Sequence, residues 1–189
     1  MMSFYSIQDL EKLTISSCDY VIFGGSFDPI HEGHVNAIRH LLRFFTKVVI
    51  AVTRKNPYKP NTPAPSTLRR LFVYDVLRYE NISVINNENG NIDCLLNTAH
   101  KSVIISELDY TFSQEVVSYY RSKLQGTLYW AVGEDIKNSV SSWKNWNELN
   151  VSMIVVPIDI ELHSKNIREE HYKLHPAIRD NKLALDAYK

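Results

Sequence analysis

Two glycines and two histidines lie close together in the segment Gly24-Gly25-Ser26-Phe27-Asp28-Pro29-Ile30-His31-Glu32-Gly33-His34. The apolar run before it, Tyr20–Phe23, is typical of a buried strand, and the run after it, Val35–Phe45, is typical of an amphipathic helix. The glycines therefore stand at a strand end, where they let phosphate oxygens approach the main chain, and the histidines stand at a helix start. Unpaired N–H groups at a helix start attract phosphate, and imidazole rings can donate hydrogen bonds to the same oxygens. The segment therefore predicts a phosphate-binding site.

Other chemistries fit this segment less well. No G-x-G-x-x-G dinucleotide fingerprint follows the strand, and the chain contains no P-loop pattern G-x-x-x-x-G-K-[ST]. His31 and His34 could instead form a metal pair, but zinc proteases use histidines four apart on one helix, whereas these are three apart. No cysteine lies nearby, and His40 is turned off that helix face. We therefore expect no metal ligand among them.

Strands and helices alternate along the remaining sequence. Apolar and β-branched runs predict strands over 47–52, 82–85, 103–106, 127–132 and 153–156. Periodic apolar residues and caps predict helices over 66–79, 92–99 and 112–123, after Gly133, and from Ser164 onward. This order predicts an α/β fold with an open, doubly wound parallel sheet, whose ligand lies over the carboxyl ends of the strands. Residues that follow predicted strands should converge there, namely Gly24, Asn56, Tyr110, Gly133 and Ser164.

The composition of the chain argues against several classes of protein. The chain has 189 residues with 21 basic and 21 acidic side chains, so its formal net charge is zero. Nothing in this balance points to nucleic acid or to a membrane surface. Cys18 and Cys94 are too few for a disulfide framework. Since no run resembles a signal peptide or a membrane span, we expect a cytoplasmic protein.

The domain organisation expected from these features is simple. Residues 20–189 form a single domain, and residues 1–19 form an N-terminal extension that we expect to be helical. Ser6 followed by Asp9 could cap a short helix in that extension.

The glycine and histidine segment resembles the [GS]-x-F-x-P-x-H-x-G-H signature of the nucleotidylyltransferase superfamily. Its fixed positions are matched by Gly25, Phe27, Pro29, His31, Gly33 and His34. Members of that superfamily join a nucleoside triphosphate to a phosphate-bearing acceptor and release pyrophosphate. The resemblance implies their Rossmann-like fold. It also implies that His31 and His34 are catalytic and that ATP binds at Gly24, Gly25, Ser26 and Phe27.

Two loops resemble those that bind the acceptor in nicotinate-nucleotide adenylyltransferases. Asn56-Pro57-Tyr58-Lys59-Pro60 is similar to the P-H-[KR] loop of that family, with Tyr58 at the usual His position. The resemblance implies that Asn56, Tyr58 and Lys59 contact the acceptor, whereas the plain alternative is a solvated, proline-rich loop. Tyr110-Thr111 resembles the family's Ser-Tyr-Thr and implies that Thr111 lies beside the pyridine ring, unless Thr111 only caps a helix.

Gly133-Glu134-Asp135, followed by Trp143, resembles the family's G-x-D and tryptophan. The resemblance implies that Gly133 and Asp135 belong to the nucleotide pocket and that Trp143 stacks on the nicotinate ring. Each residue also has a structural alternative: Gly133 can permit a turn, Asp135 can cap a helix, and Trp143 can pack in a core. For Trp146, three positions later, we favour core packing.

The segment His163-Ser164-Lys165-Asn166-Ile167-Arg168 is similar to the superfamily's [ST]-x-[ST]-x-[IV]-R. The resemblance implies that Arg168 is catalytic and grips the β,γ-phosphates, with Ser164 and Lys165 at the ATP site. His163 and Lys165 stand where the family has hydroxyl residues. A capped surface helix, with Ser164 as the cap, is the alternative.

The resemblance implies adenylyl transfer from ATP to nicotinate mononucleotide in NAD biosynthesis, with Mg²⁺ held mainly by ATP phosphates and water. It implies small-molecule substrates, no nucleic acid and no membrane, and it leaves homo-oligomers open. Two other acceptors stay open, nicotinamide mononucleotide and phosphopantetheine. A non-catalytic nucleotide-binding regulatory module is the remaining alternative, because His163 and Lys165 depart from the pattern.

Overall fold

The computed structural model describes residues 3–55, 64–85, 100–157, 164–169 and 174–188. The helix predicted over 92–99 lies outside these residues. Within them, seven strands form one sheet in the order β1-β7-β6-β2-β3-β5-β4, and every neighbouring pair is parallel. The strands are β1 (Phe4–Ser6), β2 (Tyr20–Gly25), β3 (Lys47–Val52), β4 (Val84–Ile85), β5 (Ser102–Ile105), β6 (Leu128–Gly133) and β7 (Ser152–Val156).

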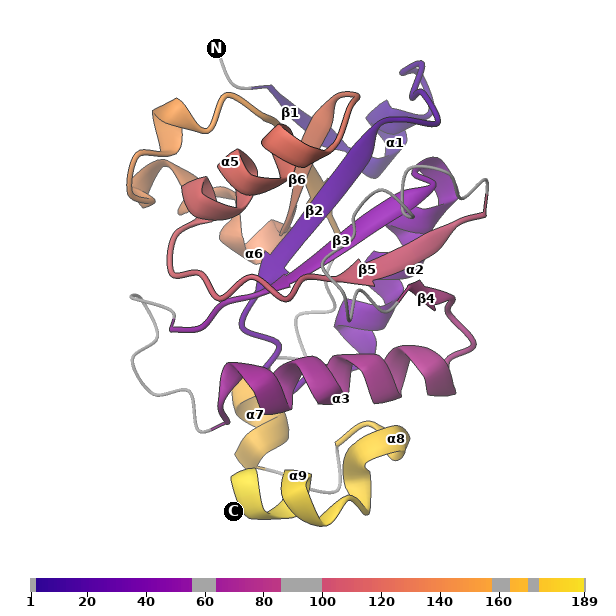
Figure 1. The fold of residues 1–189 in the computed structure, drawn as a ribbon, viewed down its shortest axis with the longest axis vertical. Coiled ribbons are helices and arrows are strands. Elements are labelled where there is room, and N and C mark those ends of the chain that lie inside the picture. The colour runs from indigo at the N-terminus through magenta and orange to yellow at the C-terminus, as the bar shows by residue number, and fades with distance from the viewer. Residues whose placement is uncertain (1–2, 56–63, 86–99, 158–163, 170–173, 189) are drawn as a thin grey trace.

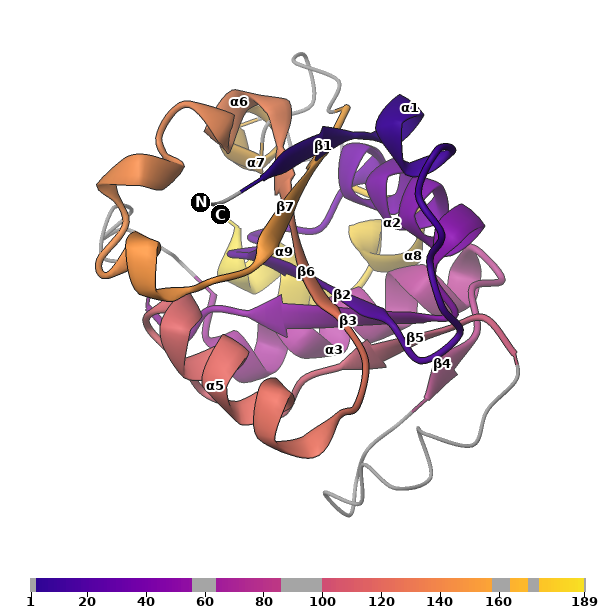
Figure 2. The same cartoon turned by 90° about the horizontal axis from the view of Figure 1, so that it is seen from above.

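Helices cover both faces of this sheet (Figures 1 and 2). The α-helices are α1 (Ile7–Leu10), α2 (Glu32–Phe44), α3 (Ser66–Tyr79), α5 (Ser113–Lys123), α6 (Glu134–Lys137), α7 (Ser164–Glu169), α8 (Pro176–Arg179) and α9 (Lys182–Ala187). Two 3₁₀ turns, Val140–Ser142 and Trp146–Glu148, follow α6. The predicted doubly wound α/β fold is therefore confirmed. None of the described helices is long and apolar enough to cross a membrane.

Alternation along the strands divides the core into two layers. In β2, Val21 and Phe23 face a layer that contains residues of α1, α2, α3 and the C-terminal helices. Tyr20 and Ile22 of the same strand face the other layer, which contains residues of α5 and of the segment after α6. Successive side chains point to opposite faces of a strand, so an apolar run with little alternation of polarity is what a sheet covered on both sides requires.

Local signals predict several elements closely. The helix expected over 66–79 and the strand expected over 47–52 have these bounds in the structure. The cap expected in the N-terminal extension is also present: the Asp9 N–H donates to Ser6 Oγ at 3.2 Å, and the Ser6 N–H donates to Asp9 Oδ2 at 2.8 Å. The sequence does not predict β1. This strand of three residues exists because Phe4–Ser6 pair with β7 at the sheet edge.

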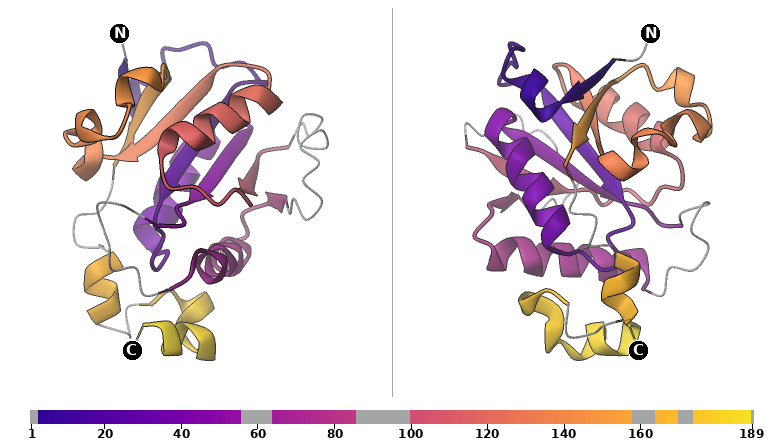
Figure 3. Two further views of the ribbon diagram at one scale, coloured as in Figure 1. Left: turned by 60° about the vertical axis from the view of Figure 1, so that its left-hand side comes forward. Right: turned by 180° about the vertical axis from the view of Figure 1, so that it is seen from behind.

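The order of strands reverses at β2. The chain runs from β2 to its neighbour β3 on one side, and β6 pairs with β2 on the other side. Ligands of open parallel sheets bind at such a switch point, beyond the carboxyl ends of the strands. In Figure 1 the arrowhead of β2 points toward the end of the molecule where α7, α8 and α9 lie. Figure 3 shows these three helices together at that end.

Candidate active site

The loop between β2 and α2 brings His31 and His34 together. His31 is the N-cap residue of α2 and is 4% exposed. The centroids of the two imidazole rings lie 3.8 Å apart, and the planes of the rings are inclined by 43°. The predicted arrangement of strand, loop and helix, with both histidines at the helix start, is therefore present. The catalytic role of these histidines stays a prediction.

One hydrogen bond sets the direction in which His34 can donate. The main-chain N–H of His31 donates to Nδ1 of His34 at 3.3 Å. A neutral imidazole has one donor and one acceptor nitrogen, so an accepting Nδ1 leaves the proton on Nε2. His34 is half-buried, and its Nε2–H is a donor suited to a phosphate oxygen.

Phe27 holds the loop in an uncommon conformation. Its φ is +48°, in the left-handed region that non-glycine residues rarely adopt. The ring is 1% exposed and packs against Phe23, with centroids 5.5 Å apart, and against His34, with centroids 4.8 Å apart. This packing offsets the conformational cost, which for a residue of this kind is of order 1–3 kcal/mol.

The indole ring of Trp130 leaves no room for a side chain at position 24, so this residue has to be glycine. A Cβ at this position would lie 2.4 Å from Cζ2 of Trp130, a side chain of β6 that is 1% exposed. At Gly25 a Cβ would lie 3.2 Å from Cε2 of Phe27, so a small shift would relieve the contact. The sequence predicts close approach of phosphate as the reason for both glycines, whereas at Gly24 the structure shows packing against an indole ring.

Replacing Gly24 by Ala is therefore expected to destabilise the protein by about 1–3 kcal/mol, the usual cost of overpacking a core. Gly25→Ala is the matched control and should lose clearly less stability. Urea unfolding of both variants, followed by tryptophan fluorescence, measures the difference. Equal stabilities of the two variants would contradict the role of Trp130.

Helix α7 docks on the same loop. The Ser164 hydroxyl donates to the carbonyl oxygen of Pro29 at 3.0 Å, and Arg168 Nη1 donates to the carbonyl oxygen of Asp28. Arg168 Nη1 also lies 3.7 Å from Asp28 Oδ2, and its side chain is 27% exposed. The predicted convergence of Ser164 with the glycine and histidine loop is therefore present, and the Ser164 hydroxyl joins two segments.

Asp28 is a buried carboxylate among cations. It is 1% exposed, and burial raises the pKa of its carboxyl above the ordinary value. That rise is opposed by the hydroxyl of Tyr188 and by the guanidinium groups of Arg69 and Arg168. Sequence reasoning quotes Asp28 within the motif but assigns it no role. The groups that compensate its charge are distant in the chain, so only the tertiary structure identifies them.

The other predicted site residues take positions around the same strand ends. Gly133 ends β6 and precedes α6, and Asp135 is exposed in the first turn of that helix without a capping bond. Thr111 precedes α5, and its N–H donates to Glu115 Oε2 at 2.9 Å; the N-cap of α5 is Phe112, so Thr111 is not the cap.

The two tryptophans after α6 lie near the 3₁₀ turns: Trp143 directly follows the first turn, and Trp146 begins the second. Trp143 is half-buried, and its ring meets Trp130 edge to face at 6.3 Å. Trp146 packs against the same core layer, as favoured from its spacing. The stacking role of Trp143 stays a prediction.

Four residues named from the sequence lie outside the described residues: Asn56, Tyr58, Lys59 and His163. For Lys165 the structure describes the backbone, in α7, but not the side chain. Their proposed contacts stay predictions.

Sequence reasoning missed Arg69, a fully buried cation in α3. Arg69 is 0% exposed and lies between the loops that follow β2 and β3. A signal was available, because Arg69 shares the core face of the helix with Phe72, Val73 and Val76 at helical spacing. A charged residue on such a face has to find partners in the interior.

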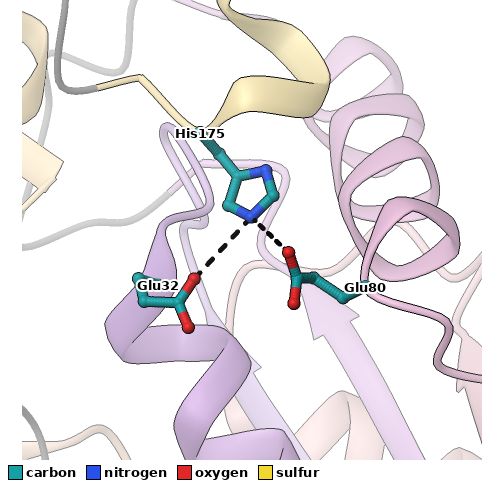
Figure 4. A group of neighbouring side chains, drawn as sticks. All are labelled: Glu32, Glu80 and His175. Carbon is teal, nitrogen blue, oxygen red and sulfur yellow. Dashed lines mark ion pairs between the residues drawn. The ribbon is translucent and has the colours of Figure 1, made fainter.

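A second cluster consists of Glu32, the first residue of α2, with Glu80 and His175, shown in Figure 4. One ligand atom of each residue lies within 4.8 Å of the others, as a metal site would require. His175 Nε2 is 3.2 Å from Glu80 Oε1 and 3.7 Å from Glu32 Oε2. However, His175 Nδ1 accepts the N–H of Ala177 at 3.3 Å, which leaves the imidazole proton on Nε2. Nε2 is then a donor to the carboxylates and not a ligand, so the cluster ties the start of α8 to α2 and α3.

Replacing His175 by Ala is expected to lower the free energy of unfolding by about 2 kcal/mol, because it removes both the polar contact with Glu80 and the cap of α8. His175→Asn keeps an acceptor near the Nδ1 position and should recover the cap alone. Urea unfolding with and without EDTA checks this. A loss of wild-type stability on adding EDTA would instead indicate a metal.

Comparison of the sequence with known proteins shows which family the chain resembles. Residues 22–177 match the family model described as cytidylyltransferase-like. A protein of Ruegeria sp. (strain TM1040) named probable nicotinate-nucleotide adenylyltransferase is 29% identical over 136 residues, which cover 71% of this chain and 64% of that relative. A protein of the same name from Neisseria meningitidis serogroup C (strain 053442) is 26% identical over 174 residues, covering 87% of this chain and 78% of that relative.

A solved structure shares the fold. The Plasmodium falciparum nicotinic acid mononucleotide adenylyltransferase complexed with NaAD matches with a TM-score of 0.60 and 16% identity, over 89% of this chain and 93% of its own. The matched family model spans most of the sheet and includes both the loop before α2 and Arg168. The chain therefore belongs to the cytidylyltransferase-like family.

Proposed function

We propose that this protein transfers the adenylyl group of ATP to nicotinate mononucleotide and releases pyrophosphate, a step of NAD biosynthesis. The observation that carries the proposal is the meeting of three donor side chains, His31, His34 and Arg168, at the loop between β2 and α2. The names of the relatives from Ruegeria and Neisseria support the choice of reaction.

In this mechanism the acceptor's 5′-phosphate oxygen forms a bond to the α-phosphorus of ATP, and the bond from that phosphorus to the bridging oxygen of pyrophosphate breaks. The nucleophile is already an anion, so no protein base is needed. Catalysis then comes from alignment and from stabilisation of charge. His34 donates through Nε2 to a phosphate oxygen, His31 supports the same phosphates, and Arg168 neutralises the departing pyrophosphate.

The remaining predicted residues keep the roles assigned from the family. ATP is bound by the loop residues and the end of β6, namely Gly24, Gly25, Ser26, Phe27, Gly133, Asp135, Ser164 and Lys165. The acceptor is bound by Asn56, Tyr58, Lys59, Thr111 and Trp143. We also propose one domain over residues 20–189 with residues 1–19 as its extension, and small-molecule chemistry in the cytoplasm.

Mg²⁺ fits this site as an ion carried by the triphosphate. Among the described residues of the loop, Asp28 is the carboxylate nearest Arg168, and it already faces that guanidinium. The imidazole rings of His31 and His34 and the guanidinium of Arg168 offer hydrogen-bond donors, which suit phosphate oxygens. Mg²⁺ would thus be held by phosphate oxygens and water, and when bound it would supply charge neutralisation for the phosphates.

The test is pyrophosphate release from ATP and Mg²⁺ with four separate additions: nicotinate mononucleotide, nicotinamide mononucleotide, phosphopantetheine and no acceptor. Fastest release with nicotinate mononucleotide supports the proposal. A preference for the amide or for phosphopantetheine would keep the chemistry and change the acceptor. Binding of ATP without release in any sample would favour the non-catalytic regulatory module.

A further inference from the structure

Arg69 donates four hydrogen bonds to main-chain carbonyl oxygens of three separate segments. Nη1 donates to Ser26 in the loop after β2. Nη2 donates to Thr53 at 2.7 Å and to Arg54 at 3.2 Å, both in the loop after β3. Nε donates to Ala64 at 2.9 Å, just before α3. One rigid guanidinium therefore spans the loops that follow two adjacent strands.

The charge of Arg69 is compensated in place. Burial lowers the pKa of the guanidinium, and the neighbouring Asp28 carboxylate opposes this shift. A guanidinium stays protonated in proteins, so this buried side chain is a permanent cation. Such a group is costly to bury unless its donors are satisfied, and here four of its five N–H groups donate to carbonyl oxygens.

We propose that Arg69 is a positioning residue that holds Ser26 of the loop after β2, and Thr53 and Arg54 directly after β3, in one fixed relative geometry. The inference rests on the proposed function, in which the first loop binds ATP phosphates and the second leads to the acceptor site. In-line transfer requires the two substrates to meet within a small tolerance, and a misplacement of about 1 Å can cost about 10²-fold in rate. Because Arg69 is fully buried and donates to main-chain oxygens, it would act through the main chain of both loops.

Among the residues that the structure describes, Thr53 and Arg54 also make main-chain hydrogen bonds of their own to neighbouring segments. The Thr53 N–H donates to the carbonyl oxygen of Gly25 at 3.0 Å, and its hydroxyl lies 3.4 Å from the same oxygen. The Arg54 N–H donates to the carbonyl oxygen of Tyr110 at 2.8 Å. The pairing of β2 with β3 ends at Gly25 and Val52. The Arg69 guanidinium connects the residues that directly follow these strands, Ser26 and Thr53.

Arg69→Lys is the main test, because it keeps the charge that faces Asp28 and removes the planar fork. A single ammonium nitrogen cannot reach Ser26 and Thr53 with the geometry of two separated nitrogens. We expect kcat to fall about 10²-fold, with KM for both substrates changed much less. Arg78→Met, an exposed arginine of the same helix, is the matched control and should leave kcat unchanged.

A second readout does not depend on activity. Hydrogen exchange at the amides of Thr53 and Arg54 should accelerate in Arg69→Lys, while amides inside β2 and β3 keep their protection. Unchanged exchange at both loops together with unchanged kcat in the folded variant would overturn the proposal. Wild-type protein that releases no pyrophosphate would refute the proposed function alone, because the exchange result still tests the positioning.

The wild-type protein provides a third measurement if Arg69→Lys does not fold. Four hydrogen bonds should restrict rotation of the guanidinium, so nitrogen-detected NMR should resolve separate Nη1 and Nη2 signals for Arg69. Arg78, which is exposed and donates one hydrogen bond to the hydroxyl of Tyr74, should show averaged signals. Averaged signals for Arg69 would contradict the proposal.

Discussion

Replacing His34 by Ala is expected to lower kcat about 10²- to 10³-fold, the effect of removing one donor aimed at transition-state charge. Negative charge crowds at the α-phosphorus during transfer, so the Nε2–H of His34 interacts more strongly with the transition state than with bound ATP. KM for ATP should therefore change much less than kcat. Steady-state pyrophosphate release with varied ATP measures both quantities.

The direction of the His34 donor provides the control. His34→Gln places an amide N–H near the Nε2 position and should recover part of kcat, whereas His34→Asn places its amide near Nδ1 and should recover less. His40→Ala, further along α2 and half-buried, should keep wild-type kcat. Wild-type kcat in His34→Ala would refute the catalytic role, and equal kcat in the Gln and Asn variants would refute the assigned tautomer.

Replacing Arg168 by Ala is expected to lower kcat/KM for ATP about 10²- to 10³-fold, because the guanidinium would neutralise the leaving pyrophosphate. Arg168→Lys keeps the charge but loses the fork, so it should recover only part of the activity. Initial rates with varied ATP, at saturating acceptor, check both variants.

Stability has to be measured on the same Arg168 variants. Arg168 lies 3.7 Å from the buried carboxylate of Asp28, so Arg168→Ala removes one of its counter-charges. Urea unfolding separates this loss from the loss of catalysis, and Arg168→Lys should unfold closer to the wild type. Arg179→Ala, an exposed arginine of α8, is the matched control for activity. An unchanged kcat/KM in Arg168→Ala would remove this residue from the proposed site.

Short-range signals predict much of this fold because they depend on neighbours along the chain. The β-branched run 47–52 and the apolar periodicity of 66–79 each identify an element with its bounds. The glycines before His31 and His34 identify a strand end and a helix start for the same reason. Where the signal is weak, prediction fails: Phe4–Ser6 become a strand through pairing with β7, a partner far along the chain.

The roles of individual side chains can likewise be predicted where they depend on chain neighbours, and not where they depend on distant partners. Residue type and local spacing indicate which groups can bind phosphate, and they place His31 and His34 at one helix start. Nothing local indicates that Gly24 faces the ring of Trp130, that Arg168 meets Asp28, or that Arg69 joins two loops.

These contacts join residues far apart in the chain, as with the 140 positions between Asp28 and Arg168 and the 43 between Ser26 and Arg69. Their formation depends on the order of strands in the sheet, which is set by the packing of both core layers together. The residue types and their short spacings in the sequence thus determine which chemistry is available to this protein. The geometry that can align two substrates arises only when the parallel strands end side by side and Arg69 and Arg168 meet their carbonyl and carboxylate partners.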